Sequence, residues 1–565
     1  MSQMFDKIRV GNTSRSTFDL SHHQVTTSDF GYLIPICVRE MVPNDDFVVT
    51  PRVFTRLAPL AAPTYGRIYC RVHHFFVPNR ILFPHFDAWI TGDTNNHYVP
   101  PYFKVSNLKS ALQDDKAFSA TGTKDRGFYS RVMGNLGLNP RFFLNNQFNP
   151  AAKVNAFPFL AYYRLWIDWF MDANIYPHTT VSEFFKDAIK NGGDISSLIT
   201  AEPYLLATRN VCFKKDYFTT AKINPQDGSA SHVNTHLASA TDNPGLSNVT
   251  SDTALQMTSQ RKVKRASGTN PNDVLSSFTI EALRAANSLQ KYLERNNYVG
   301  SRLINRILAH FGIEPTPERL DMAEFIGGDS FPIQIADVTS TAFSSADYTG
   351  LGIQAGKGVG AGAGKQIRYH AKEHGVFMSV MSILPDTGYY QGLHRMWTRG
   401  VHGDYLDYYT PEFENLGYQE VLNSEVYVPD DVLDYSEYDA EGIFGYTPRY
   451  SEYKFQNDVL GGDFLTGVDA QSGFSLDSFH LFRKMYYDDE SPLALNENFV
   501  ECNNLLNDYD RIFQYTDQSL DHFYFNIDVD VKATRPMTGF AEPSLDNNNS
   551  SDGNSVTLPY GGNRL

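Results

Sequence analysis

The chain has 565 residues, a length that fits several ordinary domains or one large β domain with long loops. Apolar residues make up 42% of the sequence, aromatic residues 14% and charged residues 20%, which supplies a sizeable core and excludes a globally disordered chain. The formal charge of −16 excludes a protein that neutralises nucleic-acid phosphates over its whole surface. A nucleic-acid role therefore requires a local basic patch or a basic partner.

The four cysteines, Cys37, Cys70, Cys212 and Cys502, lie far apart in the sequence. They form no CxxC spacing and no cluster with histidine, which argues against a zinc module or a disulfide framework. The N-terminus lacks the apolar segment of a signal peptide, and the longest nearly apolar stretch, at 376–384, is too short to cross a bilayer. We therefore expect no metal, no membrane insertion and no export.

Alternation of apolar and polar residues predicts β-strands in much of the chain, because neighbouring side chains of a strand point to opposite faces. The segment at 523–532 alternates most clearly and predicts an antiparallel strand with one solvated face. The segment at 376–384 is apolar on both faces, which predicts a central strand. Further strands are expected at 67–77, 32–42 and 47–54, the last two forming a hairpin around Pro43 to Asp46.

Helical periodicity is concentrated between residues 280 and 311. Leu283, Ala286, Leu289 and Leu293 form one apolar stripe, and a second stripe continues from 303 to 311. Gly312 is the predicted stop of that second helix. A further helix is expected at 159–171, and helices are expected to be the minority.

Three segments read as loops or tails. Residues 224–272 are rich in Ser, Thr, Asn, Asp and Gly and contain no aromatic residue, so they bury little surface. Residues 350–365 contain seven glycines and end in Gly364-Lys365, but neither the Walker pattern nor a strict GxGxxG fits. We interpret 350–365 as a surface loop and 543–565 as a polar C-terminal tail.

No residue pattern indicates a catalytic or metal site. His22-His23, His73-His74 and Glu373-His374 lack partner residues at ligand or catalytic spacing. An acidic run at 428–442 is interpreted as a solvated loop, with cation binding or docking of a basic partner as alternatives.

The densest basic run lies inside the polar insertion at 224–272. It comprises Arg261, Lys262, Lys264 and Arg265. An exposed charged loop is the plain interpretation, and contact with DNA or with a receptor is the functional one. We take these four residues as the candidate host-contact or protrusion residues.

Nine short stretches, in order from about residue 18 to 540, carry a resemblance to a known family. They are FDLSH at 18–22, FFVPNR at 75–80, KDYFT at 215–219, LERN at 293–296, HFG at 310–312, EHG at 373–375, PEF at 411–413, PRYSEY at 448–453 and RPM at 535–537. With these stretches the chain closely resembles the major capsid proteins of the Microviridae, small icosahedral single-stranded DNA bacteriophages, and within them the gokushovirus branch.

The resemblance implies one jelly-roll capsid domain over residues 1–565, an eight-stranded antiparallel β-sandwich with long insertions and a few helices. It implies sixty copies in a T=1 shell around a circular single-stranded DNA genome, with the 224–272 insertion as a protrusion at the threefold axis. It further implies a small basic DNA-binding packaging protein, a bacterial surface receptor, assembly in the host cytoplasm and a place in the virion. No cofactor and no enzymatic step are expected.

Two other classes stay open on composition alone. Abundant tyrosine and acidic loops also suit a carbohydrate-active enzyme that uses two carboxylates. A lectin-like module without assembly is the third reading, because a fold does not fix a function. Particle size separates both from a shell protein.

Overall fold

The structure is a computed structural model of the chain. It describes residues 15–92, 98–114, 128–144, 149–175, 185–187, 189–201, 207–226, 237–238, 255–257, 263–265, 274–275, 280–300, 302–339, 354–399, 407–428, 438–465, 476–485, 494–503, 507–516 and 520–539.

One half of the main sheet is built around the strand β16 (Gly375–Pro385). Every residue of β16 is buried, as expected for a strand that is covered on both faces. It pairs antiparallel with β5 (Ile68–Pro78) on one side and with β3 (Ile34–Met41) on the other. The prediction of a central strand here is confirmed.

The other half is built around β19 (Phe523–Arg535), whose residues alternate between buried and solvent-facing. It pairs with β4 (Asp46–Leu57) on one side and with β1 (Ser16–Asp19) and β2 (His22–Ser28) on the other. β4 then pairs with β14 (Gln354–Ala363) and β15 (Ile367–His370). The alternating segment is therefore a half-buried strand, as predicted.

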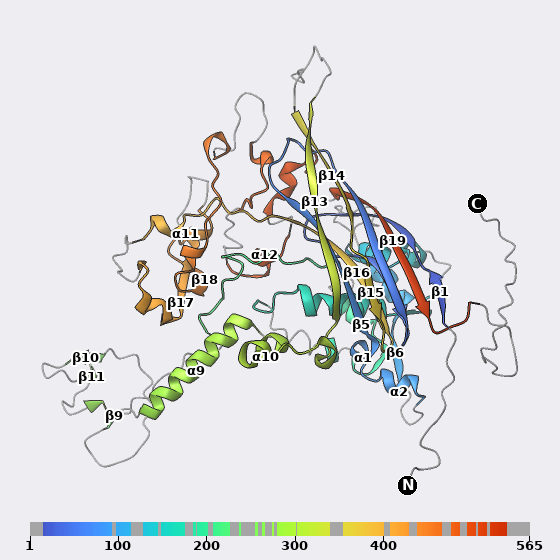
Figure 1. The fold of residues 1–565 in the computed structure, drawn as a ribbon, viewed down its shortest axis with the longest axis horizontal. Helices are drawn as coiled ribbons and strands as arrows, with labels where there is room; N and C mark the ends of the chain where they lie inside the picture. The colour runs from blue at the N-terminus through green and yellow to red at the C-terminus, as the bar shows by residue number, and fades with distance from the viewer. Residues whose placement is uncertain are drawn as a thin grey trace, which may run out of the picture.

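The two halves are joined by β13 (Glu324–Thr339), which pairs with β5 over its first part and with β14 over its second part. The sheet curls so that its halves face each other across one core, and the rings of Phe47 and Phe377 meet there with centroids 6.0 Å apart. Figure 1 shows the long strands lying side by side in this curl. The fold is mainly β and consistent with a jelly-roll β-sandwich, as predicted; the count of eight strands stays a prediction.

Two predictions about this sheet are wrong. The strands at 32–42 and 47–54 form no hairpin, because β3 pairs with β16 and β4 pairs with β19. The predicted glycine-rich loop is for the most part the strand β14. A Cβ atom at Gly358 would lie 2.6 Å from Leu57, and one at Gly362 would lie 2.4 Å from Phe331, so glycine lets this strand pack closely against its neighbours.

Several helices and a three-stranded sheet of β6, β7 and β8 pack against the β-sandwich and contribute side chains to its core. The helix predicted at 159–171 is confirmed as α6 followed by a π-helical turn, and the hydroxyl of Tyr162 donates to the carbonyl of Leu33 at 2.8 Å. The elements are α1 (Asn79–Leu82), α2 (Phe86–Ile90), β6 (Val99–Lys104), α3 (Val105–Asp114), α4 (Phe128–Asn135), α5 (Pro140–Leu144), β7 (Lys153–Asn155), α6 (Phe157–Leu165), η1 (Trp166–Phe170), β8 (Gly192–Asp194) and α8 (Ser197–Ala201).

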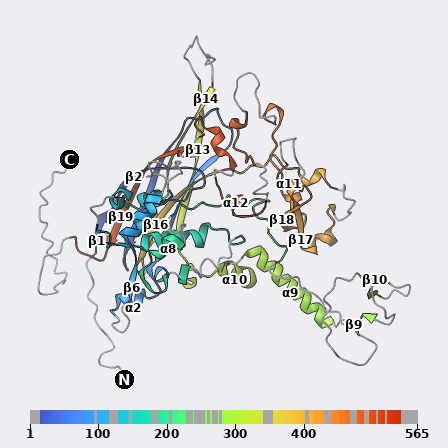
Figure 2. The same ribbon diagram turned by 180° about the vertical axis from the view of Figure 1, so that it is seen from behind.

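A second lobe has its own apolar core, which includes Phe218, Val421, Phe444 and Phe499. Figure 2 shows this lobe on the opposite side of the molecule from β1 and β2. Its elements are η4 (Arg395–Trp397), η6 (Pro411–Leu416), β17 (Tyr418–Leu422), α11 (Asn423–Val426), β18 (Ile443–Pro448), η7 (Ser451–Lys454) and α12 (Glu497–Val500). The short helices η8 (Gly462–Leu465), η9 (Leu476–Phe479) and η10 (Tyr509–Ile512) complete this part of the chain.

A helical arm leads away from the sheet. It consists of α9 (Ile280–Val299) and α10 (Leu303–Phe311), followed by η3 (Pro317–Leu320). α10 ends at Gly312, which adopts the left-handed conformation with φ of 68°. Both helices and the glycine stop are as predicted. Among the described residues, no helix has the length and apolarity that crossing a membrane requires.

Candidate assembly surface

Exposed aromatic side chains gather on the second lobe. The aromatic–arginine patch is defined by Met396, Trp397, Arg399, Tyr408, Tyr409 and Tyr453. Its apolar members are exposed by 53% for Met396, 69% for Trp397, 58% for Tyr408, 49% for Tyr409 and 50% for Tyr453. Tryptophan, tyrosine and arginine are the residues that dominate the energetics of protein–protein interfaces. The patch is therefore the candidate assembly surface of this lobe.

A tight turn after β18 brings η7 back over β17. Tyr450 begins this turn in the left-handed region, with φ of 62°, and its backbone N–H donates to the side-chain oxygen of Gln419 at 2.8 Å. A tyrosine in this region is strained and persists only where contacts hold it. The hydroxyl of Tyr450 also donates to the carbonyl of Tyr408 at 3.2 Å.

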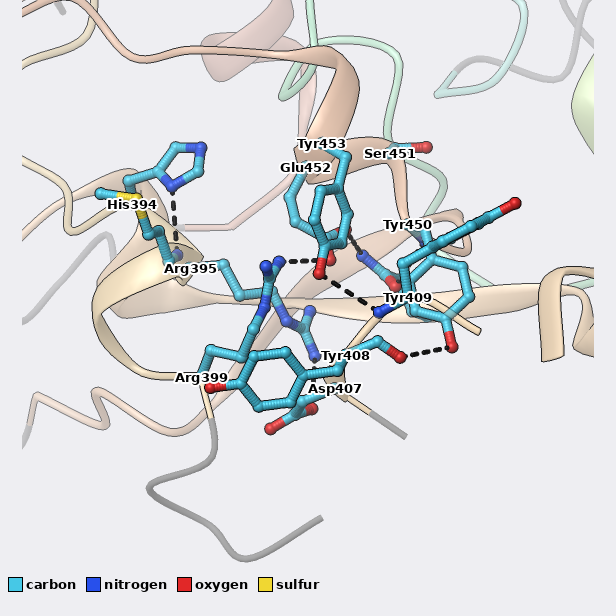
Figure 3. A network of polar contacts seen from close by, with 12 residues as sticks. His394, Arg395, Arg399, Asp407, Tyr408, Tyr409, Tyr450, Ser451, Glu452 and Tyr453 are labelled. Carbon is cyan, nitrogen blue, oxygen red and sulfur yellow. Dashed lines mark hydrogen bonds and ion pairs between the residues drawn. The ribbon is translucent and has the colours of Figure 1, made fainter. Parts of the chain in front are cut away.

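Arg399 is the centre of the patch (Figure 3). Its guanidinium lies 4.0 Å from the ring centroid of Tyr453 and 5.7 Å from that of Tyr408. One amino group lies 2.9 Å from the carboxylate of Glu452, whose side chain is only 3% exposed and also accepts from Gln419. The ion pair holds the guanidinium over the ring of Tyr453. A partner thus meets a surface that is already ordered, which lowers the entropy cost of binding.

The tyrosine rings also order one another. The ring of Tyr409 lies edge-on to Tyr450, with centroids 5.1 Å apart, and its backbone N–H donates to the hydroxyl of Tyr453 at 3.2 Å. The nearby carboxylate of Glu414 raises the pKa of Tyr409. In Figure 3 these rings and Arg399 come from separate stretches of the chain that meet. The arrangement offers flat aromatic faces for contact with a partner.

Two of the four predicted host-contact residues are described, and they lie elsewhere. Lys264 and Arg265 belong to β11 (Val263–Arg265), which pairs with β10 (Leu255–Met257). Arg261 and Lys262 lie outside the described residues. β9 (Leu237–Ala238) pairs with β12 (Val274–Leu275) in the same insertion, and Figure 1 places β9, β10 and β11 beyond the far end of α9.

Two of the residue pairs named from the sequence, His73-His74 and Glu373-His374, make contacts within the fold. His73 and His74 lie in β5, where burial lowers the pKa of each to about 4. Glu373 pairs with Arg80 at 2.9 Å, and the ring of His374 packs against Phe86. Of the acidic run at 428–442, residues 429–437 lie outside the described residues.

A buried ionic cluster escaped the sequence analysis. The Nδ1 atom of His522 lies 2.8 Å from a carboxylate oxygen of Asp29 and 3.1 Å from one of Asp510, while its Nε2 atom lies 2.9 Å from the carbonyl oxygen of Tyr515. The three side chains are at most 6% exposed.

Both ring nitrogens of His522 face acceptors, so the ring donates from both, which only the charged imidazolium does. Burial alone lowers the pKa of His522, but the hydrogen bond and charge of Asp29 and the charge of Asp510 outweigh it and the pKa is raised. The cluster ties the strand end at Asp29 to the C-terminal part of the chain, which holds both Asp510 and His522, and stabilises the fold. Sequence spacing carries no signal for it.

Comparison with known proteins identifies the class. Residues 6–545 match the family described as capsid protein (F protein). The capsid protein VP1 of Bdellovibrio phage phiMH2K is 26% identical, with 96% of this chain and 97% of that protein covered. VP1 of Chlamydia phage 1 is 25% identical over 96% of this chain and 98% of that protein, and VP1 of Spiroplasma virus 4 is 22% identical over 81% and 84%.

The chain therefore belongs to the F-protein family of capsid proteins. It is a structural, non-enzymatic component of the virion that assembles with copies of itself into a shell. The resemblance inferred from the short stretches is confirmed, and the carbohydrate-active alternative loses its support.

Proposed function

We propose that sixty copies of this chain close into a T=1 shell around a circular single-stranded DNA genome. The match over residues 6–545 supports this most directly, because it spans the sandwich, the second lobe and the arm. A closed point group lets one set of contacts serve every copy. The aromatic–arginine patch supplies one preordered surface for such contacts.

The insertion at 224–272 forms an outward protrusion in this proposal, and its basic run touches the bacterial surface receptor. The position of β10 and β11 beyond the far end of α9 supports this reading, because the arm holds them away from the sheet (Figure 1). Figure 2 shows the same separation from behind.

The acidic charge of −16 per chain opposes packaging of a polyanion. A small basic DNA-binding protein therefore accompanies the genome in this proposal. Its loss is expected to lower DNA content while empty shells still form.

Deletion of residues 230–268 tests the protrusion. We expect shells of normal diameter in electron micrographs, together with reduced adsorption of the particles to host cells. A second variant, with Arg261, Lys262, Lys264 and Arg265 all changed to Gln, keeps the loop length and removes the charge. Adsorption that weakens in this variant and with rising salt supports the receptor role, whereas normal adsorption of both variants refutes it.

A further inference from the structure

The second helix of the arm has an apolar stripe that the described part of the chain leaves partly exposed. Leu303, Ile304, Ile307, Leu308 and Phe311 fall within one face of α10 by helical spacing. None of the described residues of α10 is buried, and Phe311 is 75% exposed. A helix of nine residues gains most of its stability from packing of its apolar face.

The exposed apolar area extends over the rest of the arm. Large side chains there that are exposed by 47% or more are Leu283, Leu289, Tyr292, Tyr298, Leu303, Leu308, Phe311 and Ile313; we call these eight the arm surface. On α9 the exposed side chains point to different faces of the helix by helical spacing, whereas those of α10 lie within its one apolar stripe. The contact inferred below is therefore centred on α10.

Polar and aromatic contacts hold the base of the arm in place. An amino group of Arg302 donates to the carbonyl of Met171 at 2.6 Å. The ring of His310 stacks on Tyr292 with centroids 5.1 Å apart, and its Nε2 atom lies 2.7 Å from the side-chain oxygen of Asn296. Because polar and aromatic contacts fix the base of the arm, its apolar stripe is preorganised for a partner.

We infer that the arm surface is a contact between copies of this chain. The inference rests on the proposed shell, in which every copy meets others. Charge favours the same partner. Chains that each carry −16 repel one another over most of their surface. α10 contains no acidic residue and carries Arg306 and His310, so it is a place where another acidic chain can approach. Exposed apolar side chains on a monomeric protein favour aggregation. Burial of these side chains between copies in a closed shell removes that risk.

The test compares Leu308→Gln/Phe311→Gln with the wild type, each expressed as the full chain with its packaging partner. Glutamine is a good helix former, and Leu308 and Phe311 are 47% and 75% exposed, so the variant subunit folds with unchanged circular dichroism. We expect the yield of particles on a sucrose gradient to fall about tenfold, with folded subunits left at the top. Asn305→Gln, which lies outside the apolar stripe of α10, is the matched control and assembles normally.

Amide hydrogen exchange of α10 distinguishes a second copy of the chain from single-stranded DNA as the partner. Slower exchange of the α10 amides in wild-type particles than in free subunits supports the inference. Unchanged exchange together with normal assembly of the double variant overturns it, and so does protection of α10 in free subunits by a single-stranded DNA oligonucleotide. A wild type that forms no particles overturns the proposed shell itself, which separates the two failures.

Discussion

Replacement of His522 by Gln is expected to destabilise the folded chain in a pH-dependent way. The imidazolium lies between Asp29 and Asp510 with both contacts at hydrogen-bond distance. Glutamine carries no charge, so the variant leaves two buried carboxylates without their counter-charge. Breaking a buried ion pair in this manner costs about 3–5 kcal/mol.

The expected shift in melting temperature follows from the chain length. With ~2.1 cal/mol/K of unfolding entropy per residue, a cooperative chain of 565 residues loses about 3–4 °C. The pKa of folded His522 is raised. Its stabilisation is therefore fully present below the ordinary histidine pKa of ~6.5 and is lost as pH rises through the folded-state pKa.

Differential scanning fluorimetry at pH 6 and pH 9 measures this effect. The wild type is expected to melt about 3–4 °C above the variant at pH 6, and the gap narrows at pH 9. His23→Gln is the matched control, because His23 also lies 2.7 Å from a carboxylate, that of Asp528, but both are more than half exposed; it is expected to shift melting by less than about 1 °C. A gap that is equal at both pH values, or an equal loss in the control, refutes the reasoning.

Three further predictions concern single sites. Arg399→Met leaves the buried carboxylate of Glu452 unpaired and is expected to destabilise the chain by about 3 kcal/mol in chemical denaturation, with Arg399→Lys in between; a neutral Met variant contradicts the ion-pair account. Gly31→Ala is expected to abolish recovery of folded chain, because φ is +79° and the new Cβ would lie 1.7 Å from the carbonyl oxygen of Cys502; a folded variant with wild-type melting contradicts this. Burial raises the pKa of Cys37 to about 12, so this thiol is expected to react with a thiol reagent at pH 7 only after denaturation, and mass spectrometry of the labelled native chain checks it.

Local patterns predicted the elements that depend on local residues. The alternation at 523–532 is visible in the sequence because one face of β19 is buried and the other is solvated. The apolar run of β16 is visible because neighbours cover both of its faces. The stripes of α9 and α10 and the stop at Gly312 follow from helical period and backbone freedom in the same way.

Features that depend on distant partners were missed. The glycines of β14 read as a flexible loop, but they leave room for Leu57 and Phe331, which lie far away in the sequence. The hairpin prediction failed because β4 pairs with β19, a strand more than 450 residues further on.

The aromatic–arginine patch was missed for the same reason. Arg399 meets Tyr453 only after the turn at Tyr450 folds η7 back over β17, and no short motif encodes this approach. The sequence predicted the apolar stripe of α10, but only the structure shows that the described part of the chain leaves it partly exposed.

The most direct test of the proposed shell is the mass of the particles that the chain forms with the proposed basic packaging protein, measured by analytical ultracentrifugation and checked by electron microscopy. Sixty chains of 63.7 kDa each give a closed shell of about 3.8 MDa. The account predicts a sharp species at or above that mass and round particles of one diameter. Chains that sediment singly at every concentration and salt tested, with or without the partner, would contradict it.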